Sequence, residues 1–305
     1  MHIPDAMLQG RICPITAALA AVGLVAASVM ARRARVQPSA SRFAAVTSLV
    51  FAAQMLNFPI AQGTSGHLLG GVLSSVLLGT PLGILSIAWV VVLQSLVFSD
   101  GGWTVLGANV FNMALIGAGV GGFLRSRLAT RWAQPYGESA ATAVAAWVSV
   151  LLAALSVSVQ LALDGQIAFS LVLPAMLSAH ARIGVGEAVF TGLACFALAS
   201  KSADAKSGWR GVALPLSGAV LAGGMLSPFA SGWPDGLEFV AEKLAFLSES
   251  SPARGSPMPD YTVPFVSFPA LSTALAGLMG VAITFAIAWI WNRITIPASV
   301  RTHDL

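Results

Sequence analysis

The chain has 305 residues, of which 56% are hydrophobic and only 9% are charged. A soluble domain carries roughly 25% charged residues, so this composition excludes a soluble globular protein and predicts one whose solvent is lipid. The formal net charge of +4 does not indicate nucleic-acid binding, because basic residues spread between membrane spans act as topology signals. Cys13 and Cys195 have no C-x-x-C pairing, which argues against a disulfide framework or a thiolate metal site.

The order of charge at the start of the chain differs from that of a cleavable signal peptide. Such a peptide places basic residues before its apolar run. Here the residues MHIPD come first, and the apolar run from Ile15 to Met30 is followed by Arg32, Arg33 and Arg35. We therefore expect a retained first span with the N-terminus outside.

About 20 predominantly apolar residues cross a bilayer as a helix, and runs of this kind recur along the chain. The run at 67–79 is short and contains glycine, which indicates a broken or partial helix. A further apolar stretch at 166–180 is interrupted by Pro174, so it is not counted as a span. The predicted fold is an all-α integral membrane protein. Its spans are expected near 14–31, 42–58, 67–79, 82–98, 105–124, 140–162, 183–199, 211–226 and 270–291.

The basic residues favour one orientation of these spans. Inner loops of membrane proteins carry an excess of Lys and Arg, and twelve of the sixteen basic residues fall there if the N-terminus is outside. The C-terminus is then cytoplasmic. The twelve are Arg32, Arg33, Arg35, Arg42, Arg125, Arg127, Arg131, Lys201, Lys206, Arg210, Arg293 and Arg301. The others are Arg11, Lys243 and Arg254, expected outside, and Arg182, expected near the outer membrane edge.

The chain divides into two predicted domains. Residues 1–205 contain seven spans with short connections, and residues 206–305 contain two spans that flank a long outer segment at 227–269. This outer segment is rich in Pro, Ser and acidic residues and is too small for a catalytic domain. A loop of this length is typically functional or disordered.

A histidine at position 2 places three nitrogens in one covalent unit: the α-amine of Met1, the backbone amide of His2 and the His2 imidazole. Two adjacent chelate rings hold these atoms near one plane, and a fourth nitrogen completes a square that suits Ni(II) or Cu(II). The amine and the imidazole must lose their protons, so binding weakens as the pH falls. The alternative is that such a terminus binds metal only adventitiously.

A glycine-rich segment, GTSGH at 63–67, can supply the fourth nitrogen. His67 is expected on the outer side together with His2, whereas His303 is expected in the inner tail. The glycines allow backbone and ion to approach closely. The alternative role of His67 is that of a histidine at a helix start. We predict Met1, His2 and His67 as metal ligands.

Three ionisable residues fall in or beside an apolar span, where such residues are costly and often functional. They are His180, Arg182 and Glu187. His180 can orient a metal ligand from behind. Glu187 can instead neutralise Arg182, and this pairing is favoured over ligation.

Asparagines near 109 are also expected around the site. Asn109 and Asn112 are three residues apart and share one helix face. They and the DGG segment at 100–102 can line the same cavity. The complete set of predicted supporting residues is Ser65, Asn109, Asn112, His180 and Glu187.

A protease is the alternative function. The GTSG letters fit G-x-S-G, so Ser65 and His180 could form the Ser–His dyad of an intramembrane serine protease. This motif has only three fixed letters in a chain rich in Gly and Ser. A protease also gives no reason for His2 or for the two additional spans. We therefore predict a protein that is not an enzyme.

Several of these motifs resemble the CbiM/NikM family, the substrate-capturing components of energy-coupling-factor transporters for cobalt and nickel. The resemblance extends over nearly the whole chain, with one departure at Ala6-Met7, where the family has Gly and an aromatic residue. The residues that carry it are MHIPD at 1–5, the segments 57–59, 63–70 and 106–109, and the region 180–191. The segments 231–238 and 259–261 resemble the accessory NikN or CbiN-like partner with its P-D-G-L-E signature.

The resemblance implies a substrate-binding component of an energy-coupling-factor ABC transporter in the cell inner membrane. Its ligands would be the Met1 amine, the His2 amide and imidazole, and His67. The chain has no G-x-x-x-x-G-K-[ST] loop, so ATPase subunits and a transmembrane coupling protein are the implied partners, with no nucleic acid and no cofactor beyond the transported ion. The GTSGH loop and the square geometry favour Ni(II) over Co(II).

Overall fold

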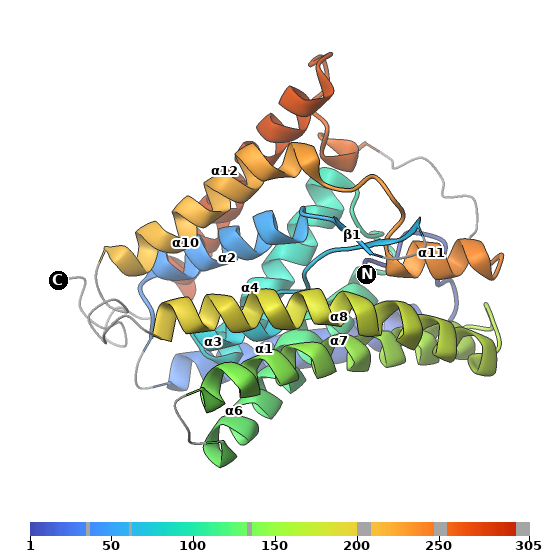
Figure 1. Ribbon diagram of the computed structural model, residues 1–305, viewed down its shortest axis with the longest axis horizontal. Coiled ribbons are helices and arrows are strands. Elements are labelled where there is room, and N and C mark those ends of the chain that lie inside the picture. The colour runs from blue at the N-terminus through green and yellow to red at the C-terminus, as the bar shows by residue number, and fades with distance from the viewer. Residues whose placement is uncertain (35–36, 61–62, 133–135, 200–208, 247–254, 297–305) are drawn as a thin grey trace.

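The computed structural model describes residues 1–34, 37–60, 63–132, 136–199, 209–246 and 255–296. Long helices lie side by side, and the N-terminus lies among them (Figure 1). Within the described residues, seven helical segments are long and apolar enough to cross a membrane. The predicted all-α membrane fold is confirmed. The seven are α1 (Ile12–Arg33), α4 with η2 (Thr80–Leu93, Gln94–Phe98), α5 with η3 and α6 (Leu106–Val110, Phe111–Val120, Gly121–Arg131), α7 (Gly137–Leu163), α8 (Phe169–Ala199), α10 with η4 and η5 (Arg210–Leu221, Ala222–Leu226, Ser227–Phe229) and α12 (Pro269–Thr295).

The remaining elements are short. Strands β1 and β2 pair antiparallel, with Phe58 opposite Gly66 and Pro59 opposite Ser65, and form the hairpin that leads to His67. The short elements are α2 (Ala40–Gln54), β1 (Phe58–Pro59), β2 (Ser65–Gly66), α3 (Gly71–Leu78), α11 (Gly236–Lys243) and η6 (Pro259–Tyr261).

Helix α8 differs from the prediction at its start. It begins at Phe169 and includes Pro174, so the stretch at 166–180 belongs to this span, and the expected start near 183 was wrong. A membrane helix tolerates proline because neighbouring helices and local adjustments satisfy the freed backbone groups. The stretch was left out of the predicted spans because of Pro174, and that exclusion was wrong.

Two of the nine predicted spans are shorter than a bilayer crossing. Helix α2 has 15 residues, or about 22 Å, against about 30 Å for the hydrocarbon core. Helix α3 has 8 residues, as expected for a broken or partial helix at 67–79. Gly79 joins α3 to α4 at a φ of 84°, which favours glycine.

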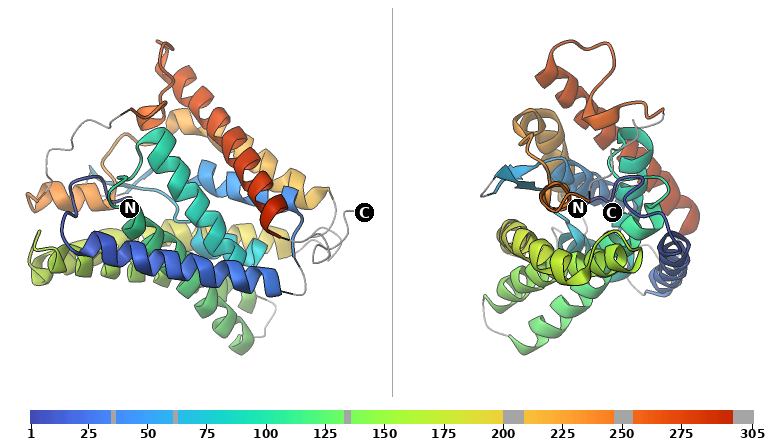
Figure 2. Two further views of the ribbon diagram at one scale, coloured as in Figure 1. Left: turned by 180° about the vertical axis from the view of Figure 1, so that it is seen from behind. Right: turned by 90° about the vertical axis from the view of Figure 1, so that its right-hand side faces the viewer.

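Helix α2 is buried because the two C-terminal long helices cover it. Helices α10 and α12 both pack along α2, as the two views of Figure 2, which are at right angles to each other, show. A Cβ added at Gly277 would lie 2.0 Å from the carbonyl oxygen of Gly223, and one added at Gly280 would lie 2.2 Å from the ring of Phe51. Small residues thus allow the close helix contacts that are typical of membrane bundles.

Apolar side chains on α1 face outward. Val22, Val25 and Met30 are 69%, 64% and 59% exposed, which suits a lipid-facing helix. Several residues used to predict the topology lie outside the described residues. They are Arg35, Lys201, Lys206, Arg254 and Arg301, together with His303.

Candidate metal site

The first residues fold back into the bundle and are held there by their backbone. Ile3 is fully buried, and the Asn109 side chain both accepts from its N–H at 2.8 Å and donates to its carbonyl at 3.0 Å. The Gly102 N–H donates to the same carbonyl at 2.9 Å. A Cβ at Gly102 would lie 2.4 Å from the backbone nitrogen of Asp5, so glycine is required for this approach. Met1 and His2 are consequently fixed in the interior.

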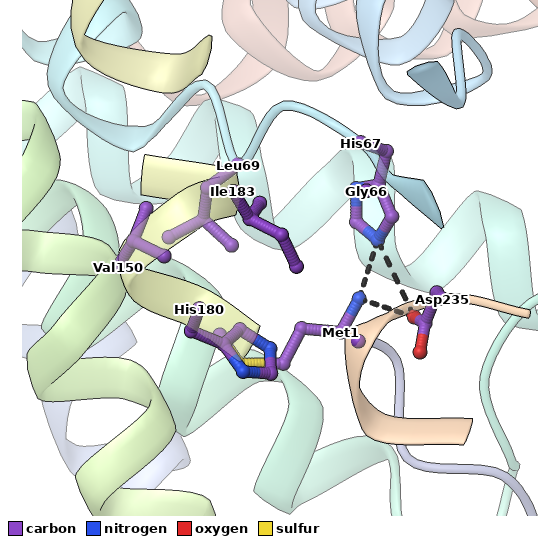
Figure 3. Close-up of a pocket in the computed structure, with 9 residues that line it drawn as sticks. Met1, Gly66, His67, Leu69, Val150, His180, Ile183 and Asp235 are labelled. Carbon is purple, nitrogen blue, oxygen red and sulfur yellow. Dashed lines mark hydrogen bonds and ion pairs between the residues drawn. The ribbon is translucent and has the colours of Figure 1, made fainter. Parts of the chain in front are cut away.

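The Met1 amine lies between two side chains from distant parts of the sequence. It hydrogen-bonds to Nε2 of His67 and forms an ion pair with Oδ2 of Asp235 at 2.7 Å (Figure 3). The distance from His67 Nε2 to the same carboxylate oxygen is 3.8 Å. All three groups are largely buried, so the charges of the amine and the carboxylate are only weakly screened.

His67 presents a lone pair to the amine. Its Nδ1 lies 3.0 Å from the Leu68 carbonyl, and because a carbonyl only accepts, Nδ1 carries the proton and Nε2 the lone pair. Burial, followed by the neighbouring Met1 ammonium and His2, lowers the pKa of His67 to about 3. His67 is therefore neutral at physiological pH, which is the form that binds a metal ion.

His2 stacks on His67 with 5.1 Å between ring centroids and 17° between ring planes. Its Nε2 lies 3.0 Å from Oε1 of Gln94, and its Nδ1 lies 2.9 Å from Oδ1 of Asp100. Tyr261 completes this network, because its hydroxyl donates to Asp100 at 2.6 Å and accepts from Gln94 at 3.1 Å. Coordination of a metal by Nδ1 therefore requires displacement of the Asp100 contact.

The charge of this network follows from its burial and contacts. Burial raises the pKa of a carboxyl group, but His2 outweighs that effect and holds the pKa of Asp100 well below its usual value. Burial and then Asp100 raise the pKa of Tyr261 well above its usual value. Asp100 is therefore an acceptor, and Tyr261 keeps the proton that it donates.

Asp235 begins helix α11 and has two separate tasks. Its Oδ1 accepts from the N–H groups of Leu237 and Glu238, and the Glu238 carboxylate accepts from the Asp235 N–H, which together form a capping box. Its Oδ2 faces Met1. Burial raises the pKa of Asp235, but the Met1 ammonium and then His67 outweigh burial and lower it. The helix cap thus fixes the carboxylate at the amine.

The loop that carries His67 is held from α8. Glu187, which is buried in α8, accepts from the backbone N–H groups of Leu69 at 2.6 Å and Gly70 at 2.9 Å. Gln54 donates to the Leu69 carbonyl at 2.8 Å. Gly70 has a φ of 69°, which favours glycine. Glu187 and Gln54 therefore set the position from which His67 faces the amine.

The C-terminal segment holds the other side of this loop. The Ser65 hydroxyl donates to the carbonyl of Trp233 at 2.7 Å, and the Ser65 N–H donates to the carbonyl of Pro234 at 2.9 Å. Ser65 thereby connects the β-hairpin to the start of α11. Its hydroxyl does not hydrogen-bond to His180 among the described contacts, so the Ser–His dyad of the alternative protease is not formed.

The structure brings Met1, His2 and His67 together and places Asn109 directly behind them. His180 lines the pocket beside Met1. Asn112 lies elsewhere, because it bonds to Gln160 and Ser156.

The pairing of Arg182 with Glu187 was wrong. Arg182 donates to Ser178 on its own helix, and Glu187 accepts from the loop backbone. A carboxylate that accepts two backbone N–H groups is stabilised without a cationic partner.

Sequence reasoning did not assign Gln94, Tyr261 or Asp235 to the site. Asp235 stood in a recognisable motif, because Asp before an apolar run with Glu three residues later is a helix start. Tyr261 lies in the segment 259–261 that carries the family resemblance, which gave it no role, and Gln94 lies in an apolar run with no local motif. Among the described residues no three His, Cys, Asp or Glu side chains gather as a metal cluster.

Comparisons with known proteins find matches along the whole of the described bundle. The family model named CbiM, cobalt uptake substrate-specific transmembrane region, matches residues 2–205, and the PDGLE domain matches residues 209–296. A fused NikMN-type nickel transport protein of Archaeoglobus fulgidus is 34% identical over 301 residues, which cover 96% of this chain and 98% of that protein.

Two further matches each cover part of the chain. The cobalt transport protein CbiM of Acetoanaerobium sticklandii is 32% identical over 119 residues, covering 39% of this chain and 47% of that protein. The crystal structure of a truncated transition-metal transporter superposes with a TM-score of 0.59 at 29% identity, covering 66% of this chain and 99% of that one.

Proposed function

The chain belongs to the CbiM family and is a multi-pass, non-enzymatic component of nickel or cobalt transport, and on that premise we propose that it captures the ion through its own N-terminus. The four donors are the Met1 amine, the backbone amide nitrogen of His2, the Nδ1 atom of His2 and the Nε2 atom of His67. The observation that carries this proposal is the contact of the buried Met1 amine with Nε2 of His67, beside the stacked His2 ring.

The donor set favours Ni(II) as cargo. Four nitrogens in one plane suit square-planar Ni(II), whereas Mg(II) and Ca(II) require oxygen ligands. The chelate is covalently fixed through Met1 and His2, and His67 faces it as a neutral imidazole. Cobalt remains an outcome of the test below.

Metal binding exchanges protons for the ion. The Met1 ammonium, the His2 amide and the Nδ1 atom of His2 must each release a proton before they coordinate. Asp235 and Asp100 are carboxylates within hydrogen-bond reach of the amine and the imidazole. They balance the positive charge first of these protons and then of the ion, so the buried site does not hold an unpaired charge in either state.

The remaining parts of the proposal concern assembly and topology. The chain acts as the substrate-binding component of an energy-coupling-factor transporter, with ATPase subunits and a transmembrane coupling protein as partners. Residues 1–205 form the capture domain, and residues 206–305 form the accessory two-span domain with its outer segment 227–269. The N-terminus faces the outside and the C-terminus the cytoplasm, as the distribution of basic residues favours.

Elemental analysis of the purified protein tests the capture site. The unmodified chain, tagged after Leu305, is compared with a version that has one alanine before Met1 and with His67→Ala. His303→Ala is the matched histidine control. We expect about one nickel or cobalt per chain in the unmodified protein and in the control, and loss of it in the other two.

The alternative results are equally definite. Equal metal in the unmodified and the extended chain would rule out the N-terminal chelate, because the added residue moves the amine. Cobalt in place of nickel would leave the site intact and change only its cargo. Loss of metal from the control as well would indicate a general loss of folding.

A further inference from the structure

His180 is a buried histidine with one ring nitrogen unexplained. It lies in α8, inside the segment that crosses the membrane, and is 1% exposed. Its Nδ1 lies 2.9 Å from the carbonyl of Met176. Because a carbonyl only accepts, Nδ1 carries the proton, and the lone pair of the neutral ring is on Nε2.

The Nε2 atom of His180 is buried and has no hydrogen-bond partner among the described residues. Buried polar atoms are nearly always paired, so an unpaired nitrogen in a pocket is available to a water molecule or to an ion. A histidine that donates from one ring nitrogen to a carbonyl is also oriented in the way that metal-binding histidines usually are.

This nitrogen lies in the same pocket as the proposed capture site. Met1, His67, His180 and Asp235 all line the pocket, and the Met1 side chain runs from its amine beside His67 toward His180 (Figure 3). A Cβ added at Gly236 would lie 3.2 Å from Nε2 of His180. His180 therefore adjoins the start of α11, whose N-cap residue, Asp235, already contacts the Met1 amine.

We propose that Nε2 of His180 is a transient ligand for the transition-metal ion, through which the ion enters and leaves the square formed by Met1, His2 and His67. The carboxylate of Asp235, which lines the same pocket, balances the charge of the ion both at the square and at His180. This inference rests on the proposed function, because it requires that the square holds the ion.

The physical reason is the cost of moving a bare ion in a dry pocket. A divalent ion that has lost its water must stay coordinated, since an unpaired charge in a low-dielectric site is very unfavourable. Imidazole suits Ni(II) and Co(II) alike. The lone pair on Nε2 of His180 can coordinate the ion while one of the four nitrogen ligands binds or dissociates. The ion therefore loads and unloads faster.

The variant His180→Asn tests the roles of the two ring nitrogens separately. The Asn side-chain N–H can take the place of Nδ1–H and donate to Met176, while the lone pair at Nε2 is removed. Arg182→Gln is the matched control, because Arg182 lies two residues further along α8 and bonds to Ser178. The full chain in lipid nanodiscs is mixed with Ni(II), and the absorbance of the bound ion gives the loading rate. Excess EDTA then gives the unloading rate.

We expect His180→Asn to bind as much nickel as the unmodified chain, with unchanged equilibrium affinity, and to load and unload at least about tenfold more slowly. Arg182→Gln should keep both rates. Unchanged rates in His180→Asn would overturn the inference, and so would a loss of equilibrium affinity, because His180 would then be a resident ligand. If His180→Asn does not fold, His180→Gln is judged by the same criteria.

Failure of the proposed function gives a different result. The chain with an alanine before Met1 would then hold as much nickel as the unmodified chain, and the inference would fall with the square. An intact square with unchanged rates in His180→Asn would overturn the inference alone.

Discussion

Replacing Glu187 by glutamine tests how the His67 loop is positioned. The buried carboxylate accepts two backbone N–H groups, from Leu69 at 2.6 Å and from Gly70 at 2.9 Å. A glutamine can accept one of them through its oxygen, but its NH2 group faces the other. One buried N–H therefore loses its acceptor, which costs about 1–3 kcal/mol.

The expected effect on metal binding follows from that cost. If the loop must dock to present His67, the apparent affinity for nickel is the intrinsic affinity multiplied by the fraction of molecules whose loop is docked. A cost of about 1–3 kcal/mol corresponds to a decrease in nickel affinity of roughly 5- to 150-fold. The upper figure applies when the docked and undocked loops of the unmodified chain are close in free energy. Glu187→Ala leaves both N–H groups without an acceptor and should weaken binding further.

Nickel affinity is measured by competition with a chromophoric chelator, and hydrogen exchange of residues 68–70 reports the loop itself. Glu138→Gln is the matched control, because Glu138 is 69% exposed and pairs with Arg125 at 3.4 Å. Surface ion pairs contribute about 0–1 kcal/mol, so the control should change affinity little. An affinity of Glu187→Gln within about twofold of the unmodified chain, with unchanged exchange at the loop, would refute the positioning role of Glu187.

Three other perturbations address the rest of the site. Asp235→Asn keeps the helix cap, since Asn caps as well as Asp, but it loses a charge-assisted bond of about 1.5–3 kcal/mol to the Met1 amine. Hydrogen exchange of the Ile3 amide should therefore become faster. The control Asp260→Asn should leave that exchange unchanged. Tyr261→Phe removes the hydroxyl that joins Asp100 to Gln94, so nickel affinity should fall about 5- to 30-fold, or about 1–2 kcal/mol, with Tyr136→Phe as control; equal affinities would contradict the network. The pKa of His67 is about 3 when the loop is docked and near 6.5 when it is undocked. Between these pH values the undocked state binds more protons, so the docked loop loses stability as the pH falls below 6.5. By pH 4.5 the loss is about 3 kcal/mol, measurable as faster exchange at residues 68–70, and a slope that persists in His67→Ala would assign it to another group.

The sequence predicted the membrane segments because hydrophobicity is a local property. Long apolar runs identified α1, α7 and α12 within a few residues. The start of α8 was missed because Pro174 is tolerated by tertiary packing, which the residues around the proline do not reveal.

The site was predictable where its chemistry is local. Met1 and His2 are adjacent in the chain, so their nitrogens were predicted as one chelating unit, and His67 was one of the predicted outer histidines and lay in a glycine-rich loop. Asp235 and Tyr261 reach the site across 234 and 161 residues, to Met1 and Asp100. Contacts at such separation depend on how the helices pack, and that packing has no local signature in the sequence.

The contact of Met1 with Asp235 has a consequence for the ratio in which the amine and its carboxylate partner are produced. Both groups belong to one polypeptide, so each site is made with its own carboxylate in a fixed ratio of one to one. Tethered groups meet at an effective concentration that reaches the millimolar range for short flexible connections. If the chain were divided between residues 205 and 209, occupancy of the contact would depend on how much of each piece the membrane contains, and an excess of the first piece would leave amines without their counter-charge.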